Sequence, residues 1–200
     1  NAEFEPFEFK DGDEVVGIDI EISQKIAEKL GVELEVSDIA FDTLITALQS
    51  GKADIVAAGM TADEDRKKNV DFSDPYFNAS QAIIVANDSD IVSRTDLNGK
   101  TVGVQLGTTG DKYCTNEDGE NDITVAEVKR YSKGMEAVSD LIAGRIDAVV
   151  IDNFPAEKLV EKNSDKVKKL DEALTSEEYA IAMPKGSTEL QKMVNEVLKE

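Results

Sequence analysis

Two stretches of this 200-residue chain share one pattern, GKADIVAAG at residues 51–59 and GRIDAVVID at residues 144–152. Each follows an amphipathic run, residues 41–50 or 133–143, whose apolar side chains recur at the spacing of one helix face. The glycine is then placed to end the helix in the left-handed conformation, and a Lys or Arg follows at the negative end of the helix dipole. The unbroken apolar run that comes next is typical of a strand buried on both faces of a parallel sheet.

The repeat therefore predicts one helix–strand unit used twice. At the same offset from each glycine, the end of the expected strand holds Gly59 or Asp152. Because ligands of open α/β sheets bind beyond the carboxyl ends of the strands, these two positions are candidates for two halves of a binding site. Helix, glycine and strand form a common succession, so the alternative is a chance match between unrelated halves.

Composition excludes several classes of function. The chain has 42 acidic and 22 basic residues and a net charge of −20, which argues against binding to nucleic acid or to an anionic membrane. It has no histidine, no GxSxG motif and no P-loop, so the usual catalytic triads and phosphate-binding motifs are absent. The absence of histidine also excludes imidazole bases and histidine metal sites.

No metal site is expected either. The acidic segment 114–122 resembles a calcium loop, but Val125 stands where the bidentate glutamate belongs, so we assign the segment to acidic surface. Cys114 is the single cysteine and cannot form an internal disulfide. No apolar run has the length of a membrane helix, and we find no signal peptide in the sequence.

Helices and strands are expected to alternate along most of the chain, which predicts an α/β fold with mostly parallel sheets. The first residues, 4–17, are interpreted as loop and turn, and a capping box is expected to start a helix at Thr61. Outside the two repeats, the other expected helices are 19–30, 155–163 and one from residue 187, and the other expected strands are 32–36, 81–86, 100–105, 123–131 and 177–184.

The polar segment 88–99 separates two such alternations, so we expect two lobes. The apolar runs QAIIVA and YAIAMP are interpreted as the two crossings between them, which permits closure about a hinge. The predicted boundaries are residues 1–84 with 184–200 for lobe one, and residues 85–183 for lobe two.

Seven phrases carry a family resemblance: AEFEPFEF, GIDIEISQKIAEKLGV, LITALQSGKADIVAAGMT, DEDRKKNVDFSDPYF, TVGVQLGTTGD, AGRIDAVVIDN and EYAIAMPKGS. In this order they resemble the periplasmic solute-binding proteins of polar amino acid ABC importers, over nearly the whole chain. The resemblance implies the two-lobed type II periplasmic-binding-protein fold, with two hinge strands and an amino acid held in the cleft.

The resemblance also implies a membrane ABC permease as partner, no cofactor, and a monomer. It implies a periplasmic or extracellular location, with an export signal or lipid anchor outside the given sequence. Members of the family begin with a strand before NAEF and extend past LKE with a helical tail. This sequence shows neither, so we expect a shortened chain or a fold completed in another way.

Arg66 is the first candidate ligand residue. It follows a helix start at Thr61, where a guanidinium beside backbone N–H groups suits a carboxylate. The alternative is a solvated arginine on the surface, which is the usual place for this residue type. The resemblance implies that Arg66 holds the α-carboxylate of the ligand and that Thr61 assists.

Asp152 is the second candidate. A carboxylate at the end of an apolar strand needs a cationic partner, because burial of an unpaired charge is costly. The resemblance implies that Asp152 binds the α-ammonium group, helped by backbone carbonyls at Ala58 and Gly59. The alternative is that Asp152 caps the helix that follows.

Two further groups belong to the expected site. The N–H groups of the loop LGTTG and the hydroxyls of Thr108 and Thr109 precede a helix and suit an anion or polar group. Phe4 and Phe41 match family positions where aromatic rings stack on the ligand side chain, although core packing is the alternative for either ring alone.

The side-chain pocket is expected to involve Asn1 and Gln105, which match positions that contact the distal group of the ligand. Carboxamides both donate and accept hydrogen bonds, which suits glutamine. Glu3 could instead serve arginine or lysine if its side chain points inward. We rank glutamine first, then arginine or lysine, then histidine or cystine.

The expected mechanism is a clamp without chemistry, in which the open form binds the zwitterion through lobe one and closure adds contacts from lobe two. Two alternatives from other classes remain. Enzymes on this fold dehydrate cyclic amino-acid precursors (cyclohexadienyl or arogenate dehydratases), which needs a general acid in the cleft. The clamp could also be the sensor module of a receptor.

Overall fold

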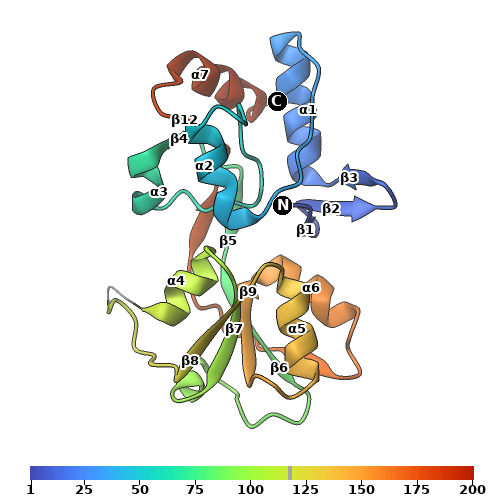
Figure 1. Cartoon of the computed structure of the whole chain (residues 1–200), viewed down its shortest axis with the longest axis vertical. Helices are drawn as coiled ribbons and strands as arrows, with labels where there is room; N and C mark the ends of the chain where they lie inside the picture. Colours follow the sequence, from blue (N-terminus) through green and yellow to red (C-terminus); the bar gives the residue numbers. More distant parts are fainter. Residues whose placement is uncertain (117–118) are drawn as a thin grey trace. The chain divides into compact units, whose positions relative to one another are not determined.

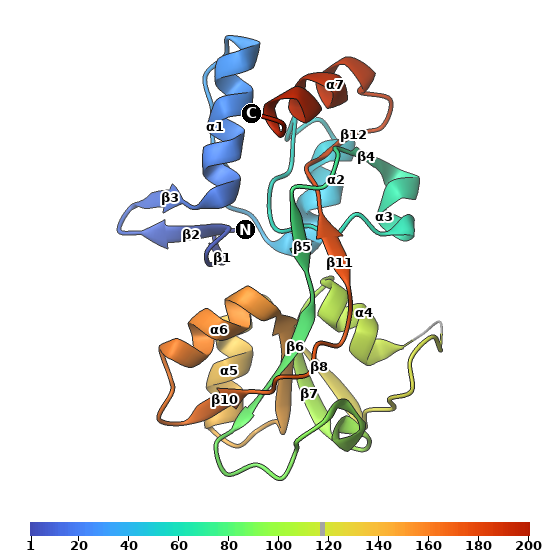
Figure 2. The same cartoon turned by 180° about the vertical axis from the view of Figure 1, so that it is seen from behind.

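The computed structural model describes residues 1–116 and 119–200, and these divide into two compact units (Figure 1). Unit 1 contains residues 1–78 and 177–200, and unit 2 contains residues 79–176. The chain passes between them twice, near β5 (Phe77–Ala79) and β11 (Glu177–Tyr179), which pair with each other in a two-stranded sheet (Figure 2).

The unit boundaries differ from the predicted ones at 84/85 and 183/184. The run QAIIVA forms β6 (Gln81–Ala86), which lies inside the main sheet of unit 2 between two other strands. Likewise, β12 (Ala182–Pro184) pairs with a strand of unit 1. Both apolar runs are buried core strands, so the crossings come before each of them in the chain.

Unit 2 is built on a five-stranded sheet in the order β10-β6-β9-β7-β8. β7 pairs in parallel with β8 and β9, whereas β6 runs antiparallel to β9 and β10. Four of the five strands therefore point in one direction, and β6 runs opposite to them. The other elements of unit 2 are η2 (Arg94–Leu97), β7 (Thr101–Gln105), α4 (Thr109–Thr115), β8 (Glu127–Tyr131), α5 (Gly134–Ile142), β9 (Ala148–Asp152), α6 (Asn153–Glu161) and β10 (Val167–Lys169).

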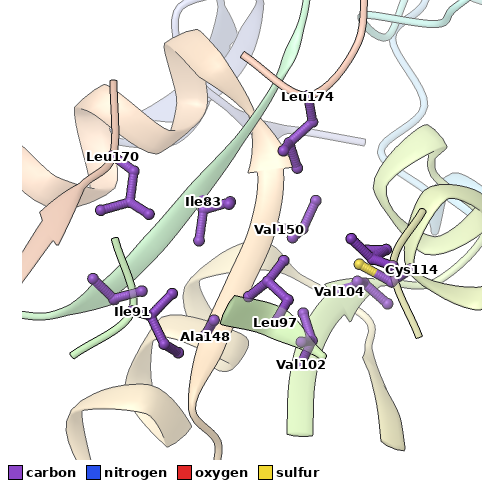
Figure 3. Packing of buried hydrophobic residues seen from close by; sticks show 12 residues of the cluster. Ile83, Ile91, Leu97, Val102, Val104, Cys114, Ala148, Val150, Leu170 and Leu174 are labelled. Atoms are coloured by element: carbon purple, nitrogen blue, oxygen red, sulfur yellow. The ribbon is translucent and has the colours of Figure 1, made fainter. Parts of the chain in front are cut away.

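One hydrophobic cluster of unit 2 lies on one face of this sheet. Val102 and Val104 of β7, Val150 of β9 and Leu97 of η2 belong to one cluster of fully buried side chains (Figure 3). Cys114 lies in the same cluster, and burial raises the pKa of its thiol to about 12. Of the acidic segment 114–122, residues 117–118 lie outside the described residues.

The second copy of the repeat folds as predicted. Helix α5 is followed by Gly144 with a φ of 68°, and strand β9 then places Asp152 at its carboxyl end. The first copy gives η1 (Phe41–Thr43), α2 (Leu44–Gln49) and Gly51 with a φ of 70°. The strand expected at 55–58 is not formed, and Val56 makes only an isolated antiparallel bridge to Ala182.

Unit 1 contains small antiparallel sheets instead of one large parallel sheet. β1, β2 and β3 form one sheet, and β4 pairs with β12. The remaining elements of unit 1 are β1 (Glu3–Phe4), β2 (Glu8–Asp11), β3 (Glu14–Val16), α1 (Ile18–Leu30), α3 (Glu64–Asn69), β4 (Val70–Phe72) and α7 (Thr188–Val197). Apolar side chains from α1, α7 and the strand region 181–183 form one of its cores.

Two further predictions for unit 1 are wrong. Residues 4–17 form a hairpin sheet instead of loop and turn, because Gly12 turns the chain with a φ of 63° and β2 pairs with β3 on either side. The strand expected at 32–36 is not formed among the described residues. Val32 and Val36 are exposed there, so this segment has no covered face to pack.

Candidate functional site

Arg66 is the most buried cation of the candidate site, with 5% of its surface exposed. It lies in the first turn of α3, where the Arg66 N–H donates to the capping side chain of Asp63 at 2.8 Å. The Arg66 guanidinium donates to the Thr61 carbonyl at 2.8 Å and lies 5.4 Å from the centre of the Phe41 ring. The surface alternative for Arg66 is therefore wrong.

The predicted capping role of Thr61 is also wrong. Asp63 is the N-cap residue of α3, and the Thr61 hydroxyl instead donates to the Glu177 carboxylate at 2.5 Å. Thr61 also forms an isolated bridge with Tyr179. Thr61, before α3, therefore contacts β11 through its side chain and its backbone. Its carbonyl fixes the orientation of the Arg66 guanidinium.

Gly59 lies at a tight backbone position beside Phe4. Its φ is 50°, and a methyl group there would lie 2.9 Å from the Phe4 ring and 3.3 Å from the Tyr179 ring. Phe4 is buried. Ala58, which precedes Gly59 in the sequence, belongs to one of the hydrophobic core clusters. The structure therefore brings Phe4 and Gly59 together, and it separately places Arg66 over the Phe41 ring.

The backbone of Gly59 is held by a buried group that the sequence analysis missed. The Gly59 N–H donates to Asp19 Oδ2 at 2.8 Å, and Asp19 in the first turn of α1 is fully buried. Burial raises the pKa of Asp19, and the hydrogen bond from the Gly59 N–H opposes this only in part. Burial also raises the pKa of Tyr76 well above its usual value.

In the sequence, Asp19 reads as an ordinary acidic residue in a first helical turn, so no local signal distinguishes it. Only the approach of Gly59, which is far away in sequence, gives Asp19 a special position. The same holds for Glu8, the first residue of β2. Its side chain is only 2% exposed, and the neighbouring residues in the sequence do not indicate this burial.

Asn1 and Glu3 lie at the start of unit 1. The Asn1 amide donates to the Ile39 carbonyl at 3.4 Å, and both Asn1 and Glu3 are half-buried. Glu3 Oε2 is buried from solvent. The N-terminal segment is therefore packed on unit 1, with an acidic oxygen turned away from water.

Asp152 ends β9 in unit 2 and is 5% exposed. It occupies the N-cap position of α6, yet its side chain makes no capping hydrogen bond to the described backbone of that helix. The capping alternative therefore does not explain why a carboxylate stands there. The strand register places Asp152 opposite Gln81 of β6.

The LGTTG loop of unit 2 is organised by its own polar groups. The Thr108 hydroxyl donates to the Gln105 carbonyl at 2.7 Å and accepts from the Asp111 N–H at 3.3 Å. Asp111 in turn accepts from the Gly107 N–H at 3.0 Å and pairs with Arg130 at 3.0 Å. The N–H of Gly107 and the hydroxyl of Thr108 thus fix the loop, and Thr109 begins α4.

Gln105 ends β7 and is 4% exposed. Its amide donates to the Ser132 carbonyl at 3.3 Å, which fixes the orientation of the carboxamide. The side chain is therefore held by the chain that follows β8.

A separate polar cluster joins β8 to α5. Asp140 accepts from Lys129 at 2.8 Å, from the Tyr131 hydroxyl at 2.7 Å and from Arg145 at 2.6 Å. Hydrogen bonding from Lys129 first, and then from Tyr131 and Arg145, holds the pKa of Asp140 well below its usual range.

Unit 1 also has a surface hollow of about 370 Å3. Three of its polar side chains are paired: Lys185 forms an ion pair with Asp71 at 2.9 Å, and Gln191 donates to the Phe72 carbonyl at 2.6 Å. None of the candidate ligand residues lines it. No helix in the described part of the chain has the length and apolar character to cross a membrane.

Comparison with known proteins was made for the sequence and for the structure. The family of bacterial extracellular solute-binding proteins, family 3, matches residues 1–200. The arginine-binding extracellular protein ArtP of Bacillus subtilis is 40% identical, with all of this chain and 78% of ArtP covered. The L-cystine-binding protein TcyJ of Escherichia coli is 33% identical, with 98% of this chain and 73% of TcyJ covered.

Solved structures of amino-acid-binding proteins also match this chain. Holo ArgBP from T. maritima superposes with a TM-score of 0.91 at 46% identity, covering 99% of this chain and 86% of that one. An ancestral arginine-binding protein bound to glutamine superposes with a TM-score of 0.89 at 46% identity, covering 99% and 87%. All four names describe binding proteins, and the expected two-lobed α/β class is confirmed.

Proposed function

Because the chain belongs to the bacterial extracellular solute-binding proteins, family 3, we propose that it binds a free L-amino acid with one half-site on each unit. The unit 1 half-site comprises Asn1, Phe4, Phe41, Ala58, Gly59, Thr61 and Arg66. The unit 2 half-site comprises Gln105, Thr108, Thr109 and Asp152. Neither half-site has a role in catalysis.

The environment of Arg66 is the observation that carries this proposal. A guanidinium with 5% exposure is costly to bury, so its position must be stabilised by the groups around it. The Thr61 carbonyl and the Phe41 ring hold it in one orientation. A fixed, poorly hydrated guanidinium suits a carboxylate, because charge-assisted hydrogen bonds are the strongest ones in proteins. Arg66 is thus proposed to bind the α-carboxylate.

Asp152 is proposed to bind the α-ammonium group. The carboxylate is buried at a strand end and does not cap α6. A buried carboxylate is stabilised by a cation, and the ammonium group of an amino acid supplies one. A ligand gripped at both ends binds more tightly to the two half-sites together than to either alone, and this difference drives closure.

For the ligand side chain, we propose arginine first and glutamine second, which reverses the order expected from the sequence. The buried Glu3 oxygen and the net charge of −20 both favour a cationic ligand. The names of ArtP and of ArgBP from T. maritima support arginine, and glutamine binding by the ancestral arginine-binding protein supports the second rank.

We further propose that the protein acts outside the cytoplasmic membrane as a monomer and delivers the amino acid to an ABC permease. The family name supports the location. A lipid anchor and an export signal remain part of this proposal and are tested on the full reading frame.

A thermal-shift screen against the twenty amino acids tests the function, since a ligand that binds only the folded state raises the melting temperature by mass action. We expect the largest shift with L-arginine, followed by L-glutamine. Calorimetric titration then measures the affinity. If none of the twenty amino acids raises the melting temperature, the proposed function is wrong. If L-glutamine raises it more than L-arginine does, the ligand ranking expected from the sequence, with glutamine first, is correct.

A further inference from the structure

Gln81 is a fully buried polar side chain of unit 2 that the candidate site does not include. It begins β6, and the strand register places it directly opposite Asp152, the last residue of β9. Polar groups that are buried in a folded protein are nearly always hydrogen-bonded. A glutamine side chain brings both a carbonyl oxygen and an NH2 group into the interior, so its neighbours identify its role there.

The backbone hydrogen bonds fix how closely Gln81 and Asp152 approach each other. The Asn153 N–H donates to the Ser80 carbonyl at 2.8 Å, which makes these two residues a hydrogen-bonded pair just beyond the two strands. Hydrogen-bonded and non-hydrogen-bonded pairs alternate in an antiparallel ladder, so Gln81 and Asp152 form a non-hydrogen-bonded pair. The Gln81 N–H accordingly donates to another segment, to the Thr175 hydroxyl at 2.8 Å. In such a pair the two Cβ atoms lie about 4.5–5.5 Å apart, so the side chains are close neighbours.

Both side chains lie on the face of the sheet that α4 covers. Ile83 and Val150 form the pair two residues further along the strands, and both belong to the hydrophobic cluster that includes Cys114 of α4 (Figure 3). Side chains alternate between the two faces of a strand, so residues two apart share a face. Gln81 and Asp152 therefore project to the same side as this cluster.

Gly110 of α4 leaves room for the Gln81 side chain. A methyl group at Gly110 would lie 2.8 Å from Gln81 Oε1 and 3.0 Å from the Val150 carbonyl. The oxygen end of the Gln81 carboxamide therefore lies against the backbone of α4. The NH2 group is the other end of the same planar group, and a carboxylate directly opposite, that of Asp152, is an acceptor for it.

We propose that Gln81 is a positioning residue, whose amide donates a hydrogen bond to the Asp152 carboxylate and fixes that carboxylate for the α-ammonium group of the ligand. A side chain that is ordered before the ligand arrives spares the entropy of ordering it on binding. The inference rests on the proposed function for its effect on affinity, whereas the pairing of Gln81 with Asp152 is a property of the ligand-free protein.

Equilibrium unfolding in urea tests the pairing in the ligand-free protein. Gln81→Glu keeps the size of the side chain but places a second carboxylate opposite Asp152, and like charges at directly opposite positions are destabilising. We expect a lower urea midpoint for Gln81→Glu at neutral pH. Adding Asp152→Asn should raise that midpoint, because a carboxylate again faces a carboxamide, whereas Asp152→Asn alone should not raise the native one. The same effect of Asp152→Asn in both backgrounds overturns the pairing.

Calorimetric titration with L-arginine tests the positioning. Gln81→Met keeps the length of the side chain and removes the donor, so Asp152 must be ordered when the ligand binds. We expect the affinity to fall about three- to tenfold, which corresponds to the ordering of one side chain. Ile83→Val is the matched control on the same strand and face, and it should lose stability through a small cavity but keep the native affinity. Native affinity in Gln81→Met overturns the positioning role.

The double variant of Gln81→Met with Asp152→Asn separates a positioning role from a general loosening of unit 2. If Gln81 acts through Asp152, the double variant should bind L-arginine as tightly as Asp152→Asn alone. A further loss of about three- to tenfold in the double variant overturns the route through Asp152. If the native protein binds none of the twenty amino acids, the proposed function fails, and the unfolding experiment still decides whether Gln81 pairs with Asp152.

Discussion

Gly59→Ala and Gly51→Ala form a matched pair that measures how tightly Phe4 packs on the backbone at Gly59. Both glycines belong to unit 1 and have a positive φ, 50° and 70°. A methyl group at Gly51 would meet nothing within 4 Å, whereas at Gly59 it would lie 2.9 Å from the Phe4 ring. The two changes therefore share the backbone cost and differ in packing.

The magnitudes follow from these two contributions. The left-handed conformation costs about 1–2 kcal/mol for a residue with a side chain, and the reduced entropy of the unfolded chain returns about 0.4–1 kcal/mol. Gly51→Ala should then lose about 1 kcal/mol of unfolding free energy. Gly59→Ala adds overpacking of about 1–3 kcal/mol, for a total of about 2–4 kcal/mol.

Equilibrium unfolding in urea, followed by far-ultraviolet dichroism, measures both variants. Affinity for L-arginine is measured beside it, and only Gly59→Ala should weaken binding, because only that change displaces the Phe4 ring. Equal losses of stability in the two variants, to within about 0.5 kcal/mol, would refute the close contact between Gly59 and Phe4.

Three further predictions concern charged groups. Arg66→Lys keeps the charge but loses the planar fork, so calorimetry should show a decrease in arginine affinity of about tenfold or more with unchanged far-ultraviolet dichroism; native affinity would remove Arg66 from the site. Asp152→Asn should weaken binding by a similar factor without loss of stability, and a normal affinity would leave Asp152 without a ligand role. Because the pKa of Asp140 is lowered in the folded state, its contribution to stability is present at neutral pH and is lost as the pH falls below about 4. Asp140→Asn should therefore be less stable at pH 7 and lose less stability on acidification; an acid unfolding curve identical to that of the native chain would contradict this.

The sequence by itself determined the second repeat, the helices that end at Gly31, Gly51 and Gly144, and the strand that places Asp152 at its carboxyl end. These features depend on local rules, namely the apolar spacing of one helix face and the freedom of glycine at positive φ. Periodicity can be read from neighbouring residues, so tertiary contacts were not needed to find them.

Tertiary structure alone decided which residues of the first repeat form strand pairs and which acidic side chains are buried. Residues 55–58 are as apolar as a strand, yet pairing depends on the neighbour the fold supplies, and only Val56 finds a bridge. Glu8 and Asp19 have ordinary neighbours in sequence, and only the fold buries both carboxyl groups and brings the Gly59 N–H to Asp19. Electrostatic energies depend on distance and burial, which no local pattern of residues encodes.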